Sequence, residues 1–363
     1  MSTSDKRGPL QVARRARLLE ALQRYGVLRI SDLTGELGAA AVTIRRDIAQ
    51  MASEGLVRRV HGGVALPGAD ASDLAEGGGG ESIGMLVPSL DYYWPDVARG
   101  AEEAARELDM KVVLRGSSYE SEDDLPLLTR LVEQGVDALI VAPRMDAPTS
   151  ARTIEWLAGT GVPVVLLERT ATVGPHHEVL ESVVTDHALG AEMAVRHLQS
   201  LGHRRIGAVL AEHSPTTPHV RRGWLAALEV DPVEFLVPDA AVPSCAAALD
   251  AALDRCRATG TTALIVHADA EAIALVQRCE DRGLTVPGDL SVVAYDDAVA
   301  GLFSPALTAV RPPRGSIGRA AVRLAADRLA DPDRPAHRVV ISPSLRIRQS
   351  TAAPPAPAGS VRP

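Results

Sequence analysis

Long apolar runs are missing from this sequence. No stretch of about 18 consecutive apolar residues occurs, the length that a membrane-spanning helix needs, and residues 1–10 are mostly polar and charged. These residues therefore lack the apolar core of a secretory signal. Both absences predict a cytoplasmic protein without a membrane partner.

Cysteines and the motifs of covalent chemistry are scarce as well. The three cysteines, Cys245, Cys256 and Cys279, are widely spaced and form no Cys-x-x-Cys pair, so we expect neither a disulfide framework nor a zinc site. A Gly-x-Ser-x-Gly elbow and a phosphate-binding loop with its Lys-Ser/Thr pair are also absent. We predict no catalytic residue, no cofactor and no metal, so the protein is not expected to be an enzyme.

Charge is distributed unevenly along the chain. The whole chain has a net charge of −8, but residues 1–66 contain eleven Lys and Arg against six Asp and Glu, a local +5, which leaves −8 − 5 = −13 for the rest. A basic head on an acidic body indicates that the head alone approaches a polyanion such as DNA.

The length and composition predict several domains. The chain has 363 residues, more than the roughly 250 to 300 that one core serves efficiently. Residues 67–82 include four consecutive glycines, which favour a flexible linker. We expect a small domain over residues 10–66, this linker, a body over residues 83–351, and a disordered tail, rich in proline and alanine, over residues 352–363.

The apolar spacing in the head predicts three helices and a hairpin. The expected helices cover residues 10–24, 30–37 and 40–54, and the expected strands cover residues 56–60 and 64–66. In the third helix, Ile44, Ile48 and Met51 share one face. The glycines between the two strands suit a tight turn.

Two strings of the head, TIRRD at residues 43–47 and EGLVRRVHGG at residues 54–63, resemble the DeoR-type winged helix-turn-helix. The resemblance implies that the third helix enters the major groove of double-stranded DNA and that the hairpin is the wing. Guanidinium groups at such a helix can bond a guanine edge or grip phosphates. The expected DNA contacts are Thr43, Arg45, Arg46, Arg58, Arg59 and His61. The alternative is a solvated helix face in which Asp47 pairs with one of the arginines.

Strand-like and helix-like segments alternate along the body. This pattern predicts an α/β fold whose parallel sheets carry helices on both faces. Eight strand-like runs lie at residues 83–88, 111–115, 137–142, 162–167, 183–185, 205–210, 263–266 and 290–295. The clearest helical stretches lie at residues 97–108, 124–134, 189–201, 247–257 and 270–282.

Several strings of the body resemble the sensor of LacI/GalR-type regulators. They are GVPVV at residues 161–165, LGHRRI at 201–206, GLTVPGDLSVVAYDD at 283–297 and SPALTAV at 304–310. The resemblance implies a two-lobed, periplasmic-binding-protein-like sensor of type I that forms a homodimer or higher homo-oligomer. Its chain should cross between the lobes near Asp186, near Val310 and around residues 334–340. A small, sugar-like effector should bind at the carboxyl ends of the strands.

Candidate effector contacts follow the strands of the body. Tyr92, Tyr93 and Trp94 come directly after the first strand, a conspicuous group in a chain with 3% aromatic residues, and such rings can stack on a sugar or a nucleobase. Their alternative role is a lid over the core of their own lobe. The expected effector contacts are Tyr93, Trp94, Arg169, Arg221, Asp269 and Asp296.

Two positions depart from the pattern of that family. The arginine expected three residues before a Gly-aromatic pair falls at Val220, and the asparagine expected before Asp269 is Ala268. A non-standard effector or a shifted loop is therefore expected.

The sequence as a whole predicts a DNA-binding transcriptional repressor whose operator affinity is controlled by a sugar-like effector. The main alternative is a regulator whose cleft has lost its ligand and serves for dimerisation. A stand-alone solute-binding protein would need a signal peptide, and an α/β enzyme would need a catalytic constellation. Neither feature is found in the sequence.

Overall fold

The computed structural model describes residues 11–29, 33, 37–39, 41–60, 63–67, 80–90, 93–118, 121 and 123–355. The chain forms two compact units. The first contains residues 1–89, 101–182 and 318–337, and the second contains residues 90–100, 183–317 and 338–363. Three of the passages between the units therefore follow residues 182, 317 and 337, close to the three crossings expected from the sequence.

The head contains two described helices around a small core. Leu18 and Leu22 from the first helix pack with Ile44, Ile48 and Met51 from the third. This packing explains the apolar spacing, because each helix turns one stripe of apolar side chains toward the other. The described elements of the head are α1 (Gln11–Tyr25), β1 (Val27–Arg29), α3 (Ala41–Ser53), β2 (Arg58–Val60) and β3 (Gly63–Ala65).

The predicted hairpin is confirmed, and it gains a third strand. β2 pairs antiparallel with β3, and β1 pairs with the other edge of β3. The predicted helix over residues 30–37 falls largely outside the described residues, although Leu33 and Leu37 are described and buried in the head core. Residues 68–79 of the expected linker and residues 356–363 of the expected tail also lie outside the described part.

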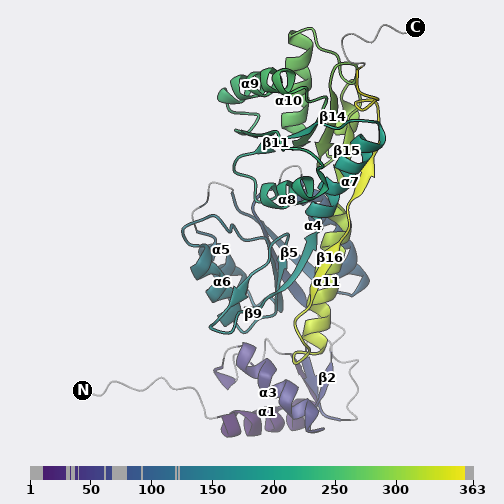
Figure 1. The fold of residues 1–363 in the computed structure, drawn as a ribbon. Helices are drawn as coiled ribbons and strands as arrows, with labels where there is room; N and C mark the ends of the chain where they lie inside the picture. The colour runs from purple at the N-terminus through teal and green to yellow at the C-terminus, as the bar shows by residue number, and fades with distance from the viewer. Residues whose placement is uncertain are drawn as a thin grey trace, which may run out of the picture. The chain divides into compact units, whose positions relative to one another are not determined.

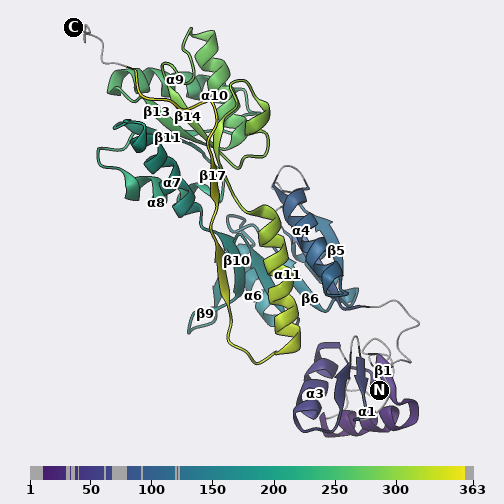
Figure 2. The ribbon, with the colours of Figure 1, turned by 90° about the vertical axis from the view of Figure 1, so that its right-hand side faces the viewer.

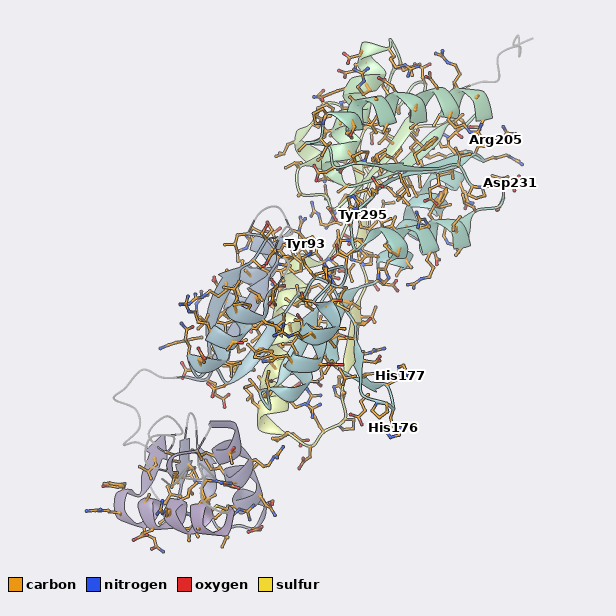
Figure 3. All side chains as sticks on the ribbon, turned by 90° about the vertical axis from the view of Figure 1, so that its left-hand side faces the viewer. Tyr93, His176, His177, Arg205, Asp231 and Tyr295 are labelled. Atoms are coloured by element: carbon orange, nitrogen blue, oxygen red, sulfur yellow. The ribbon has the colours of Figure 1, made fainter. Side chains whose placement is uncertain are left out.

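The first large sheet has six strands in the order β16-β10-β7-β6-β4-β5. β4 pairs in parallel with β5 and β6, and β6 pairs in parallel with β7. Its elements are β4 (Ser82–Val87), α4 (Trp94–Glu107), β5 (Lys111–Gly116), α5 (Leu125–Glu133), β6 (Ala138–Val141), α6 (Ser150–Gly159), β7 (Val164–Leu167), β10 (Glu181–Thr185) and β16 (Arg338–Ile341). A small hairpin, β8 (Thr172–Val173) and β9 (Glu178–Val179), carries His176 and His177 at its tip (Figure 3).

The second large sheet also has six strands, in the order β12-β11-β13-β14-β15-β17. α9 and α10 cover one face and α7 and α8 cover the other (Figure 1). The elements are α7 (His187–Ser200), β11 (Ile206–Ala211), α8 (Thr217–Ala227), β12 (Glu234–Val237), α9 (Ser244–Thr259), β13 (Ala263–His267), α10 (Asp269–Asp281), β14 (Ser291–Tyr295), β15 (Thr308–Arg311) and β17 (Ser344–Arg346). Helix α11 (Arg314–Ala330) follows β15, and most of its residues belong to the first unit.

The predicted α/β architecture with parallel sheets is confirmed. Strands β11 to β15 of the second sheet pair in parallel, and β17 joins β15 antiparallel. The interior strands are buried along their whole length, which accounts for their continuous apolar runs. Among the helices of the described residues, none combines the length and the apolar character that crossing a membrane requires.

Candidate DNA-binding surface and effector site

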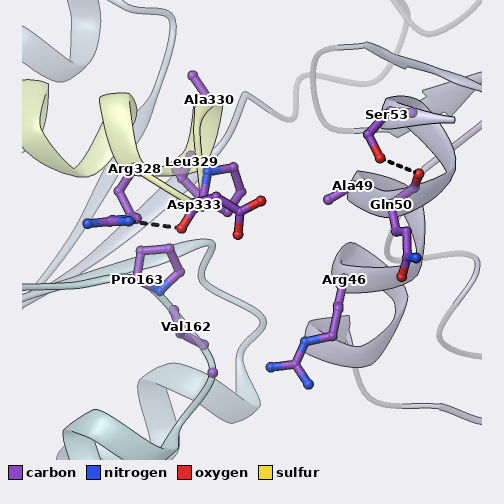
Figure 4. Close-up of a pocket in the computed structure, with 13 residues that line it drawn as sticks. Arg46, Ala49, Gln50, Ser53, Val162, Pro163, Arg328, Leu329, Ala330 and Asp333 are labelled. Atoms are coloured by element: carbon purple, nitrogen blue, oxygen red, sulfur yellow. Dashed lines mark hydrogen bonds between the residues drawn. The ribbon is translucent and has the colours of Figure 1, made fainter. Parts of the chain in front are cut away.

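The exposed side of α3 carries the first group of expected DNA contacts. Arg46 is exposed and Thr43 is half-buried. Figure 4 shows Arg46 extending from the side of α3 that also carries Ala49, Gln50 and Ser53. The backbone of Arg45 belongs to α3, but its side chain lies outside the described part, so its DNA contact stays a prediction.

Asp47, in contrast, is turned into the head. Its carboxylate is 1% exposed and pairs with two arginines of α1, with Arg14 Nε 2.6 Å from Oδ2 and Arg15 Nε 3.5 Å from Oδ1. The acid that follows Arg46 in the sequence therefore ties α3 to α1. Its place inside the head leaves the exposed side of α3 cationic.

The wing carries the second group of expected DNA contacts. Arg58 on β2 is exposed and lies opposite Ala65 of β3. The side chain of Arg59 and the whole of His61 lie outside the described residues, and their DNA contacts stay predictions.

In the second unit, a strained turn follows strand β14. Asp296 and Asp297 have φ angles of 94° and 52°, a left-handed region that residues other than glycine rarely adopt. The Asp297 carboxylate is buried and pairs with Arg311 Nε at 2.6 Å and Arg348 Nη1 at 2.8 Å. Asp296 is half-buried, so its position at the end of a buried strand agrees with the expected effector contact.

The Asp269 carboxylate binds the backbone N–H groups of residues 297–300, which continue that turn. One carboxylate oxygen accepts hydrogen bonds from the backbone N–H groups of Ala298, Val299 and Ala300 at 2.7, 2.8 and 3.1 Å, and the other accepts from Asp297 at 3.2 Å. Burial raises the pKa of Asp269 to about 6, although the bonds from the backbone N–H groups act in the opposite direction. Asp269 is 4% exposed, so this geometry favours a residue that shapes the turn after β14 over one that contacts a ligand.

The two aromatic candidates differ in burial. Tyr93 is half-buried and its ring lies 5.7 Å from Cζ of Arg314. Trp94 is buried and packs edge-on against Tyr93, with ring centroids 5.3 Å apart. This placement favours a core-packing role for Trp94, and Tyr93 is the more exposed of the two rings.

Three histidines and a tyrosine lie near the carboxyl edge of the second large sheet. His267 ends β13, Tyr295 ends β14, and the two rings lie 5.4 Å apart. His187 Nδ1 lies 3.0 Å from the Tyr295 hydroxyl, and the rings of His187 and His219 are 6.4 Å apart. Burial lowers the pKa of His267 to about 4, so this imidazole is neutral at physiological pH. Tyr295 and Tyr93 are labelled in Figure 3.

Arg169 and Arg221, the two arginine candidates, have local partners. Arg169 follows β7 in the first unit, and its Nη1 donates to the carbonyl oxygen of Glu168 at 2.7 Å. Arg221 on α8 pairs with Glu234 on the edge strand β12, with Nε 2.8 Å from Oε1. The ion pair gives Arg221 a role at the sheet edge, and its predicted effector contact finds no support in this geometry.

The surroundings of Val220 suit an apolar side chain at the position where the family pattern expects an arginine. Its side chain is buried in the core that also contains Trp224 and Ala191. Three residues later, α8 comes so close to α7 that a side chain on Gly223 would overlap the backbone of Ala188. A guanidinium at position 220 would therefore lie in an apolar core, and the first turn of α8 presents the exposed His219 instead.

The sequence reasoning missed His187, His267 and Arg314. The two histidines stand at strand ends or helix starts of the carboxyl edge, so the rule that selected Asp296 could have found them. Arg314 lies beyond β15, and no local pattern marks it.

Metal ligands do not assemble in the described part of the chain, where no group of three or more His, Cys, Asp or Glu side chains could hold an ion. The three cysteines are buried and free. Burial raises the pKa of the thiols of Cys256 and Cys279 to about 12 and about 11, values typical of inert structural thiols.

Known families match both parts of the chain. A model for a DeoR-like helix-turn-helix domain matches residues 14–69, and a model for a periplasmic binding protein-like domain matches residues 195–351. Both resemblances drawn from the sequence are thereby confirmed.

Three relatives illustrate the similarity. An uncharacterized HTH-type transcriptional regulator of Streptomyces limosus is 32% identical over 288 residues, which cover 74% of this chain and 78% of that protein. The HTH-type transcriptional repressor PurR of Aliivibrio fischeri is 27% identical over 278 residues, covering 74% and 80%. A solved LacI family transcriptional regulator from Enterococcus faecium, with bound ribose, superposes with a TM-score of 0.61 and 25% identity, covering 75% of this chain and 99% of that one. These relatives are regulators rather than enzymes.

Proposed function

We propose that this chain, which belongs to the LacI-type family of helix-turn-helix transcriptional regulators, is a repressor that binds operator DNA through its head and a small sugar-like effector through its second part. The proposal includes a homodimer, in which two heads meet two half-sites of the operator. One observation carries the DNA-binding part. Arg46 is exposed on α3 while Asp47, its neighbour, is buried against α1.

The charge of the head supports this reading. Arg46 of α3 and Arg58 of β2 are exposed on a domain with a local charge of +5, and phosphate contacts of such groups supply most of the non-specific affinity for DNA. The direct base contacts are assigned to the start of α3, with Thr43, Arg45 and Arg46. The backbone contacts are assigned to the wing, with Arg58, Arg59 and His61.

A selection experiment tests the DNA-binding part. Purified full-length protein would enrich duplexes from a random-sequence library, and the affinity for the selected duplexes would then be compared between wild type, Arg46→Ala and Arg17→Ala. Arg17 is an exposed arginine on α1 and serves as the matched control. Because Arg46→Ala loses one base contact, its affinity for the selected duplexes should fall about fivefold to a hundredfold. The affinity of Arg17→Ala should change little. Equal affinities in all three proteins, or no enrichment by wild type, would refute the assignment.

The effector part of the proposal rests on three side chains of the second unit. Tyr93 offers a half-buried ring, Asp296 offers a half-buried carboxylate, and His219 offers an exposed imidazole. A ring face, an imidazole and a carboxylate together suit a hydroxylated ligand, and the carboxylate disfavours an anion. The ribose bound by the Enterococcus faecium relative belongs to that chemical class.

A second function has its own support. Val220 fills a core position where the family pattern expects an arginine, and both oxygens of Asp269 are occupied by the backbone. These features suit a regulator whose cleft has lost its ligand and serves for dimerisation. Isothermal titration with a panel of sugars and nucleosides separates the two functions. Heat from any member supports the sensor, and no heat from all members supports the second function.

A further inference from the structure

Arg314 contacts three segments of the second unit at once. It begins α11 and is 8% exposed. Its Nε lies 3.1 Å from Oδ2 of Asp96 in the first turn of α4. Nη1 and Nη2 donate to the backbone carbonyls of Asp296 and Asp297 at 3.1 and 3.3 Å. The ring of Tyr93 lies over the guanidinium.

The turn that Arg314 holds is strained. Left-handed backbone at two successive aspartates is unfavourable and persists only where the surrounding contacts enforce it. Asp269 fixes the N–H groups of this turn, and Arg311 and Arg348 fix the Asp297 carboxylate. Arg314 binds the carbonyl groups of the Asp296–Asp297 turn and also contacts Tyr93 and Asp96, in the segment called here the Tyr93 turn.

A close backbone contact brings Arg314 to α4. A side chain on Gly100 would overlap the backbone carbonyl of Gly315, so α4 and α11 touch at this pair, and Figure 2 shows the two helices side by side. Within the first unit the same helices are joined by ion pairs between Arg319 and Glu103 at 3.1 Å and between Arg323 and Glu107 at 3.2 Å. The contact with α4 therefore places Arg314 between the Tyr93 turn and the Asp296 turn.

We propose that Arg314 is a positioning residue of the effector site, a latch that fastens the Tyr93 turn to the Asp296–Asp297 turn before an effector is bound. The inference rests on the proposed function, in which Tyr93 and Asp296 contact the effector. Arg314 is itself buried and its three nitrogens already have partners. It therefore sets the distance between the two contacts and leaves recognition to them.

Guanidinium chemistry suits this task. Its planar fork donates in several fixed directions and keeps its charge at every physiological pH. It can therefore pair with a carboxylate on one side and bond two carbonyls on the other. A lysine at the same position would keep the charge beside Asp96 but would have a single nitrogen for all three partners.

Hydrogen–deuterium exchange on the full, ligand-free chain tests the latch. The proteins are wild type, Arg314→Gln, Arg314→Lys and the matched control Arg311→Gln. Arg311 bonds the same turn through the Asp297 carboxylate. In Arg314→Gln we expect exchange on the order of tenfold faster in both residues 93–100 and residues 296–300, since charge-assisted bonds are lost at each segment.

The controls separate the latch from a general effect on stability. Arg311→Gln should accelerate exchange in residues 296–300 and leave residues 93–100 unchanged. Arg314→Lys should restore protection in residues 93–100 more than in residues 296–300. Unchanged exchange in Arg314→Gln would overturn the latch, and so would acceleration throughout the second unit. Because no DNA or effector takes part, either result leaves the proposed function to its own tests.

Discussion

Replacing Asp269 with asparagine is expected to destabilise the second unit by about 2 to 3 kcal/mol. An amide has one acceptor oxygen, so its best orientation keeps the bonds from Ala298, Val299 and Ala300 and leaves the Asp297 N–H facing an NH₂ group. One orphaned buried donor costs about 1 to 3 kcal/mol, and the other three bonds lose their ionic acceptor. The neutral amide avoids part of the burial penalty that raises the pKa of Asp269, which keeps the total modest.

Urea unfolding measures this loss. The transition of the second unit can be followed by tryptophan fluorescence, to which Trp94 and Trp224, both buried in that unit, contribute. A thermal scan should show a shift of roughly 4 to 10 °C. Asp289→Asn is the control, because the exposed Asp289 carboxylate also accepts from a backbone N–H, that of Thr285 at 2.8 Å. Its cost should stay below about 1 kcal/mol. Equal urea midpoints for the two variants would refute the structural role given to Asp269.

Two further substitutions, at His267 and at Asp47, have predicted effects on stability and on DNA binding. His267 has a pKa lowered from 6.5 to about 4 by burial, so the unfolded chain binds more protons between these values and stability falls as pH falls through that window. Wild type should lose about 2 kcal/mol more than His267→Gln between pH 7 and pH 5, and parallel urea-midpoint curves would contradict this. The opposite shift of Asp269 is present in both proteins and cancels. Asp47→Asn should speed amide exchange in α1 and α3 and weaken DNA binding, since Arg14 loses its buried partner, whereas Glu54→Gln, at an exposed partner of the same cluster, should change neither.

The head illustrates what apolar spacing can and cannot predict. α1 and α3 lie within about one residue of the predicted bounds, because the apolar residues of each core face recur at helical spacing within the segment itself. β1 was not predicted. Its three residues, Val27–Arg29, form a strand because they pair with β3, whose residues lie far along the chain. Pairing of that kind has no local signature in so short a segment.

The carboxyl edge of the second sheet shows the same limit in its side chains. Asp296 was found because it directly follows a buried strand at a position that matches the resembled family, and strand ends collect at one edge of a parallel sheet. Arg314 could not be found this way, since its partners are Asp96 and the carbonyls of Asp296 and Asp297. Asp269 was placed at the correct edge, but its oxygens point to backbone donors that only the folded turn brings together.

Val220 and His219 indicate which kind of ligand the carboxyl edge of the second sheet would suit. The family pattern would place a guanidinium on the first turns of α8, where it could bond an anionic or a hydroxylated ligand. In this chain that position is apolar and buried, and the exposed neighbour is an imidazole whose ring lies 6.4 Å from His187. Arg311, Arg314 and Arg348 stand near the same edge, but each is bound to the carboxylate or the carbonyl of an aspartate. A ligand at this edge would therefore meet a phenol, imidazoles and a carboxylate, a set of groups that suits the hydroxyl groups of a sugar.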